Sequence, residues 1–158
     1  MRALVQRVSR ASVVVEEEVE SKIELGLVVM VGVSKYDLEE DSVYISDKVI
    51  NLRIFPNVSG KFDRSVLDVK GELLVVSQFT LYGQTHKGRR PNFIEAASSD
   101  YARRLFVHTV ELFNKSGLLV ETGCFQTNMM VEIHNDGPVT IMLDSDDSVV
   151  SRQSRTFG

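Results

Sequence analysis

The hydrophobic positions of this chain fall mainly into short apolar runs, which are typical of strands. Residues 1–8 alternate between apolar and polar side chains, and residues 12–15 and 19–23 flank three glutamates as two strands of a hairpin flank their turn. The run 25–33, LGLVVMVGV, is almost continuously apolar, yet it is too short to cross a membrane as a helix. We therefore predict a hairpin followed by a strand at the centre of a sheet.

Two segments have the spacing of amphipathic helices. The first begins near Asp37, where Asp-Leu-Glu-Glu resembles a capping box, and continues to about Leu52. The second is capped by Ser99 or Asp100 and ends at Gly117. Its apolar face consists of Tyr101, Ala102, Leu105, Phe106, Thr109, Leu112 and Phe113.

Further strand-like segments lie between and after these helices. They are expected at residues 53–55, 62–69, 72–82, 118–122, 129–134 and 139–143, with a turn at Asn135–Pro138 between the last two. The pattern as a whole predicts an α/β fold: a layered domain whose mixed or antiparallel, barrel-like β core of about eight strands is covered by two or three helices mainly on one face. We assign residues 1–143 to this domain and expect the polar, aperiodic residues 144–158 to form a flexible tail.

The stretch Glu72–Tyr82, ELLVVSQFTLY, departs from the usual pattern of a buried strand. It begins with the apolar run Leu73–Val76, but Ser77, Gln78 and Thr80 then surround Phe79. Buried polar groups are costly unless they are paired with each other, with backbone or with a ligand. This stretch is therefore either an ordinary strand end or the wall of a binding site.

Charge and composition narrow the choice of partners and compartment. A formal charge of −4 argues against broad clamping of duplex nucleic acid but allows a local contact with one RNA end. The basic cluster His86–Arg90 is either a solvated loop or a phosphate contact. No apolar span, secretion signal or second cysteine beside Cys124 is present, so we expect no membrane, no intramolecular disulfide and a cytoplasmic location.

Metal and cofactor chemistry find little support in the sequence. His86, His108 and His134 show no ligand spacing with each other or with Cys124, so we predict no metal. No glycine-rich phosphate loop follows a strand, and Ser77 lacks the GxSxG setting of a nucleophile elbow. We therefore predict no cofactor.

The segment Asn135–Thr140, NDGPVT, is the second unusual stretch. Its Gly-Pro dipeptide is consistent with an ordinary hairpin turn, but a cis peptide is inexpensive there. A cis Gly137–Pro138 bond would hold two successive carbonyl oxygens rigidly, with no side chain at the glycine to obstruct a ligand.

Together, SQFTL at 77–81 and NDGPVT at 135–140 resemble the D-aminoacyl-tRNA deacylase family. Further matching segments are LVQRVSRASV near the N-terminus, RIFP…GK at 53–61, RPNF at 90–93 and Thr122-Gly123 followed by Met129. The resemblance spans about Met1 to Leu143.

The resemblance implies a chirality-proofreading hydrolase that frees D-amino acids, and mischarged glycine, from the 3′ aminoacyl-adenosine end of tRNA. Ser77, Gln78, Phe79 and Thr80 would line the catalytic site, and N–H groups near Phe79 and Thr80 would form an oxyanion hole. Thr80 would act as nucleophile or as a positioning group. Because no His, Lys or carboxylate lies within two residues of Thr80, we favour hydrolysis assisted by the RNA's own 2′-OH.

The resemblance also implies a homodimer with active sites at the subunit interface. Gly137 and Pro138, as a Gly-cisPro motif, would reach into the partner's site and reject L-amino acids, and Met129 would line the same pocket. Phe93 and Ala102 are weaker candidates, since core packing explains both. Two alternatives stay open: a noncatalytic RNA 3′-end or nucleotide-binding module, and an interaction protein whose Gly137–Pro138 hairpin serves only dimerisation.

Overall fold

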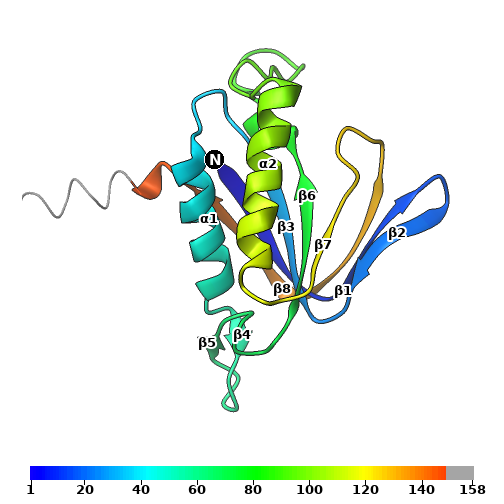
Figure 1. Ribbon diagram of the computed structural model, residues 1–158, viewed down its shortest axis with the longest axis vertical. Coiled ribbons are helices and arrows are strands. Elements are labelled where there is room, and N and C mark those ends of the chain that lie inside the picture. The colour runs from blue at the N-terminus through cyan, green and yellow to red at the C-terminus, as the bar shows by residue number, and fades with distance from the viewer. Residues whose placement is uncertain (149–158) are drawn as a thin grey trace, which may run out of the picture.

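The computed structural model describes residues 1–148, which form a layered α/β domain (Figure 1). Its strands are β1 (Arg2–Val15), β2 (Glu18–Ile23), β3 (Gly26–Gly32), β4 (Phe55–Pro56), β5 (Phe62–Arg64), β6 (Glu72–Ser77), β7 (Val120–Thr122) and β8 (Met130–Asp144). Its helices are α1 (Glu39–Asn51), α2 (Ser99–Asn114) and the 3-10 turn η1 (Phe79–Tyr82). No helix within the described residues is both long and apolar enough to span a membrane.

The main sheet has the strand order β2-β1-β3-β6-β7, with β8 pairing along β1. β3, β6 and β7 are parallel to one another, whereas β1 is antiparallel to β2, β3 and β8. The hydroxyl of Ser21 on β2 donates to the carbonyl of Thr122 on β7 (2.8 Å), which links the two ends of the strand order. The sheet is thus mixed and nearly closed, which confirms the predicted barrel-like α/β class.

Both faces of the central strands are buried. Leu73 and Val75 of β6 face the helix layer formed by α1 and α2, which lie on the same side of the sheet (Figure 1). Leu74 and Val76 face a second apolar cluster inside the curved sheet, together with Val8 of β1. This two-sided burial explains the nearly continuous apolar sequence of these strands.

The start of α1 differs from the predicted capping box. The helix begins one residue later than Asp37 would allow, and the N–H of Leu38 donates to the carboxylate of Asp41 (2.7 Å). The carboxylate of Asp37 instead accepts hydrogen bonds from the amino group of Met1 (2.6 Å) and from the N–H of Ser34 (2.7 Å). Burial raises the pKa of Asp37, and the neighbouring ammonium group offsets only part of that effect.

The edge strand predicted over residues 62–69 ends early. β5 stops at Arg64 because the N–H and hydroxyl of Ser65 both donate to the carboxylate of Asp68, at 2.8 and 3.0 Å, and fold the chain into a turn. The strand predicted to continue to Tyr82 likewise ends at Ser77, where η1 follows.

The packed structure continues past Leu143. Ser145 is fully buried, and its N–H donates to the carbonyl of Met1 (2.8 Å), while Asp144 accepts from Arg2 (2.9 Å). Most of the predicted tail, residues 149–158, lies outside the described part of the chain.

The turn predicted at Asn135–Pro138 is wrong, because β8 runs through it. Gln6 pairs with Thr140 and Val8 with Asn135, so residues 136–139 stand opposite Arg7 alone. Such a bulge keeps the two strands paired on either side while it pushes the extra residues out of the ladder. The Gly137–Pro138 peptide bond at its centre is cis.

Candidate active site

The C-terminal end of β6 carries the first group of candidate residues. β6 lies between the parallel strands β3 and β7, and the last main-chain bond runs from the Gln78 N–H to the carbonyl of Val31 (2.8 Å). A Cβ atom at Gly32 would lie 3.0 Å from the Gln78 carbonyl oxygen, so glycine gives the chain room to cross here. Ser77 and Gln78 therefore reach the carboxyl edge of parallel strands, where ligands commonly bind.

The turn η1 then presents backbone donors at this edge. The N–H groups of Phe79 and Thr80 open the turn and so have no acceptor within it. Arg2 holds the turn in place, because its guanidinium donates to the carbonyl of Leu81 (3.0 Å) and lies 4.6 Å from the ring centre of Tyr82. Burial raises the pKa of the Tyr82 hydroxyl, so this group stays protonated and cannot serve as a base.

The hydroxyl of Thr80 has an amide as its neighbour. The side-chain NH₂ of Gln78 donates to Thr80 Oγ1. Within residues 1–148 no imidazole, amine or carboxylate is hydrogen-bonded to this hydroxyl. Because an amide does not take up a proton near neutral pH, nothing bonded to Thr80 activates it as a nucleophile.

The candidate residues Ser77, Gln78 and Phe79 share one surface depression with Met129. Its volume is about 460 Å³, and Thr80 adjoins it through Gln78. The remaining lining residues are Val76, Gln126, Thr127, Asn128 and Val131. None of these side chains is ionisable, so the depression is polar but uncharged.

The opposite wall, residues 126–129, lies on the connection from β7 to β8. The N–H of Cys124 points at the sulfur of Met129 (3.2 Å), and a Cβ atom at Gly123 would lie 3.0 Å from the same sulfur. Arg103 of α2 anchors this wall by donating to the side-chain carbonyl of Gln126 (3.2 Å). The sequence analysis missed Gln126–Asn128, because a polar loop has no periodicity; only Gly123 and Met129 marked its neighbourhood.

Phe93 borders the site, whereas Ala102 does not. Phe79 is 56% exposed, and its ring meets the ring of Phe93 edge to face at 4.9 Å between centroids. Gly83 permits this contact, since a Cβ atom there would lie 3.1 Å from the Phe93 ring. Ala102 packs against the main hydrophobic core from α2, as its place in the helix stripe predicted.

The Gly137–Pro138 segment does not line the depression of its own chain. Both residues are exposed, in the bulge of β8. Two contacts hold the bulge. The Nε of Arg7 donates to the carbonyl of Asp136 (3.0 Å), and the Oδ1 of Asn135 accepts from the Val139 N–H across the base of the bulge (2.7 Å). Arg7 is a buried residue that the sequence analysis placed only in a strand.

No group of three or more His, Cys, Asp or Glu residues in the described part of the chain could hold a metal ion. The residues that line the site offer backbone donors, amides, hydroxyls and apolar surface. Such a site can orient a substrate and stabilise developing negative charge.

The fold and this site together define a small α/β domain with an uncharged surface depression at the carboxyl ends of its parallel strands. Comparison with known proteins makes the assignment specific. The chain belongs to the D-Tyr-tRNA(Tyr) deacylase family of hydrolases, whose model matches residues 4–144.

Relatives with known names agree with this family. The chain is 56% identical over 145 residues to a D-aminoacyl-tRNA deacylase of Clostridium botulinum, covering 92% of this chain and 97% of the relative. It is 55% identical over the same length and the same shares to a D-aminoacyl-tRNA deacylase of Thermotoga petrophila.

Two solved structures share the fold. A structure described as c-Myc DNA Unwinding Element Binding Protein superposes with a TM-score of 0.86 at 40% identity, over 91% of this chain and 98% of that one. A probable eukaryotic D-amino acid tRNA deacylase gives a TM-score of 0.79 over 90% and 98%, and at 17% identity it supports the fold alone.

Proposed function

We propose that the chain hydrolyses the ester of D-aminoacyl-tRNA in the depression lined by Ser77, Gln78, Phe79 and Met129. One observation carries this proposal. Residues from two distant segments, each marked by the family resemblance, line a single uncharged depression next to the N–H groups of Phe79 and Thr80, which have no acceptor within their own turn. The substrate would be the 3′ aminoacyl-adenosine end of tRNA. Because tRNA is charged and used in the cytoplasm, the protein would act there.

The chemistry requires attack of water on the ester carbonyl. The water oxygen bonds to the carbonyl carbon, and the carbonyl oxygen becomes an oxyanion that accepts hydrogen bonds from the N–H groups of Phe79 and Thr80. The carbon–oxygen bond to the 3′ ribose oxygen then breaks, and that oxygen takes up a proton. The products are the free amino acid and tRNA.

The neighbouring 2′-OH of the terminal ribose would help to position the water or relay its proton. The uncharged lining supports this role, since no side chain of the depression can act as a general base at neutral pH. The Gln78 amide would hold Thr80 in place, so that Thr80 positions the substrate without forming a covalent intermediate.

A second copy of the chain would complete the site. Gly137 and Pro138 are exposed and lie outside their own chain's depression, so in a two-fold dimer each bulge would enter the partner's site. Their carbonyl oxygens would contact the substrate α-amino group and leave no space for an L side chain. D-amino acids and achiral glycine would pass, which makes the protein a proofreading enzyme that also clears mischarged glycyl-tRNA.

The deciding experiment measures release of tyrosine from D-Tyr-tRNA and L-Tyr-tRNA. Rapid release of D-tyrosine with no release of L-tyrosine supports the proposal. Tight tRNA binding without release would favour a noncatalytic RNA 3′-end module, and neither binding nor release would favour a protein-interaction role.

A further inference from the structure

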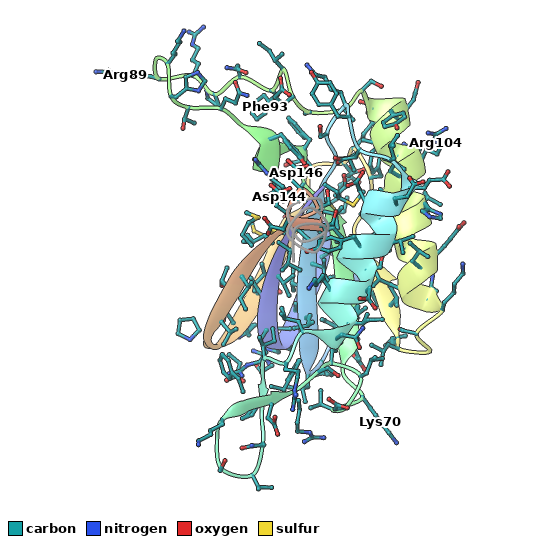
Figure 2. The ribbon with its side chains drawn as sticks, turned by 90° about the vertical axis from the view of Figure 1, so that its left-hand side faces the viewer. Lys70, Arg89, Phe93, Arg104, Asp144 and Asp146 are labelled. Carbon is teal, nitrogen blue, oxygen red and sulfur yellow. The ribbon has the colours of Figure 1, made fainter. Side chains whose placement is uncertain are left out.

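The segment 84–92 forms an arm beside the proposed active site. Main-chain bonds close its base in both directions: the Gln84 N–H donates to the Asn92 carbonyl (2.9 Å), and the Asn92 N–H donates to the Gln84 carbonyl (3.0 Å). Gly88 has a positive φ of 73° at the outer bend, a conformation that glycine adopts without strain. Figure 2 shows this segment standing away from the sheet, with Arg89 at its outer end.

The arm is positively charged within an acidic protein. It contains Lys87, Arg89, Arg90 and His86 but no Asp or Glu, whereas the whole chain carries a net charge of −4. All four basic side chains are exposed. In the described part of the chain, none of them takes part in an ion pair; of the lysines and arginines there, only Arg2, Arg7, Lys35 and Arg53 do. What sets the arm apart is that its cations are adjacent and have no carboxylate among them. The arm therefore holds unneutralised cations that no intramolecular contact explains.

The base of the arm is joined to the catalytic turn. The Phe93 ring, directly after the arm, packs edge to face on Phe79, and Gly83, directly before it, lies at the end of η1. A fully extended chain spans at most about 3.6 Å per residue, so the outer bend at Gly88 is at most about 18 Å from Gly83. A bound 3′ end of RNA would have its next phosphates within that range.

We infer that the arm 84–92 binds phosphates of the tRNA acceptor end, through Lys87 and Arg89, while the depression beside Phe79 holds the terminal aminoacyl-adenosine. This inference rests on the proposed function and adds the segment that binds the phosphates of the acceptor end. The depression itself is uncharged, so it supplies none of the electrostatic attraction for a polyanion such as RNA. The arm supplies that attraction locally, which suits a protein whose overall charge would repel RNA.

The test compares two double variants on two substrates. Lys87→Gln with Arg89→Gln removes the charges of the arm. The matched control, Lys61→Gln with Lys70→Gln, removes two exposed lysines far from it; Lys70 lies at the opposite end of the molecule in Figure 2. The substrates are D-Tyr-tRNA and D-tyrosyl-adenosine, which keeps the ester and the terminal nucleoside but has no phosphate.

Each single-strand phosphate contact contributes about 0.7 to the logarithmic dependence of affinity on salt. Between about 50 and about 200 mM salt, the KM of the wild type for D-Tyr-tRNA is therefore expected to rise about sevenfold more than that of the arm variant. The control variant should behave as the wild type. Hydrolysis of D-tyrosyl-adenosine should change less than about twofold in the arm variant, because that substrate lacks the phosphates.

Two results would overturn the inference. Equal salt dependence in the arm and control variants would mean that the arm does not contact RNA. Equal loss of activity on both substrates would mean that the arm merely shapes the catalytic turn. Binding of uncharged tRNA, followed by anisotropy over the same salt range, tests the arm even if no ester is cut, so failure of the proposed function is distinguishable from failure of the inference.

Discussion

Arg7 on β1 donates a hydrogen bond from its Nε to the main-chain carbonyl oxygen of Asp136 on β8, 3.0 Å away, at the point where the two strands leave their regular pairing. Its Nη1 also donates to the carbonyl of Ile54 (2.6 Å), and the side chain is only 8% exposed. One buried guanidinium thus satisfies two carbonyl groups that no strand partner reaches, and it fixes the base of the Gly137–Pro138 bulge.

Replacement of Arg7 by alanine should therefore destabilise the protein. The buried Ile54 carbonyl and the part-buried Asp136 carbonyl lose their donor and a cavity is left, so we expect the free energy of unfolding to fall by about 2–4 kcal/mol in urea titration. Arg10→Ala, at an exposed position of the same strand, is the matched control and should change it by less than about 0.5 kcal/mol. Equal effects of the two substitutions would contradict the structural role given to Arg7.

A mixing experiment tests whether the active site is shared between two chains. Gly137→Ala places a Cβ atom 2.7 Å from Val139 Cγ2 and blocks the bulge, while Gln78→Glu puts a carboxylate into the uncharged depression. Each variant alone should be nearly inactive. In a heterodimer, however, one site combines an intact depression with an intact bulge, so an equal mixture should regain about a quarter of the wild-type rate.

The mixture must be exchanged under conditions that dissociate and re-form the dimer. Each variant alone, taken through the same dissociation and re-formation, is the control. If the mixed sample stays as inactive as its components, each chain carries its own complete site, and the shared-site proposal fails.

Local pattern was sufficient where a segment's structure is decided by its own burial. β3 and β6 follow from continuous apolar runs, and α2 follows from its apolar stripe. Only one wall of the depression could be predicted from the pattern. Ser77, Gln78 and Phe79 follow an apolar run, and the change from apolar to polar residues is visible in the sequence. Met129 came only from the family resemblance, because a single methionine in a loop has no distinguishing pattern.

The errors at Asn135–Pro138 and at Asp37 share a cause, which is a partner distant in the sequence. Asn135–Pro138 has the composition of a turn, yet β8 continues because Arg7, distant in the sequence, supplies hydrogen-bond donors to the bulge. Asp37 has the position of a helix cap, yet its carboxylate binds the amino group of Met1. A local pattern cannot reveal which distant donor will compete for a polar group, so such positions become clear only in the folded chain.

The turn formed by Ser65 and Asp68 should make the free energy of unfolding depend on pH in the acidic range. Hydrogen bonds from the Ser65 backbone and hydroxyl lower the pKa of Asp68 below its ordinary 3.8. A lowered folded-state pKa gives stability that is fully present above the unfolded pKa and is lost as the pH falls through the folded value. Between about pH 5 and about pH 2, urea midpoints of the wild type should fall more steeply than those of Asp68→Asn; parallel curves would exclude this contribution.

The last prediction separates RNA-assisted hydrolysis from covalent catalysis by Thr80. The only hydrogen-bond partner found for its hydroxyl among residues 1–148 is the Gln78 amide, so no base activates it. Thr80→Val keeps the shape and removes the oxygen, and single-turnover hydrolysis of D-Tyr-tRNA should slow by less than about tenfold, as for a lost positioning contact. D-Tyr-tRNA whose terminal ribose lacks the 2′-OH should react at least about a hundredfold more slowly with the wild type, because the assisting group is gone. A trapped Thr80 ester, or complete loss of turnover in Thr80→Val with a normal rate on the 2′-deoxy substrate, would instead establish Thr80 as the nucleophile.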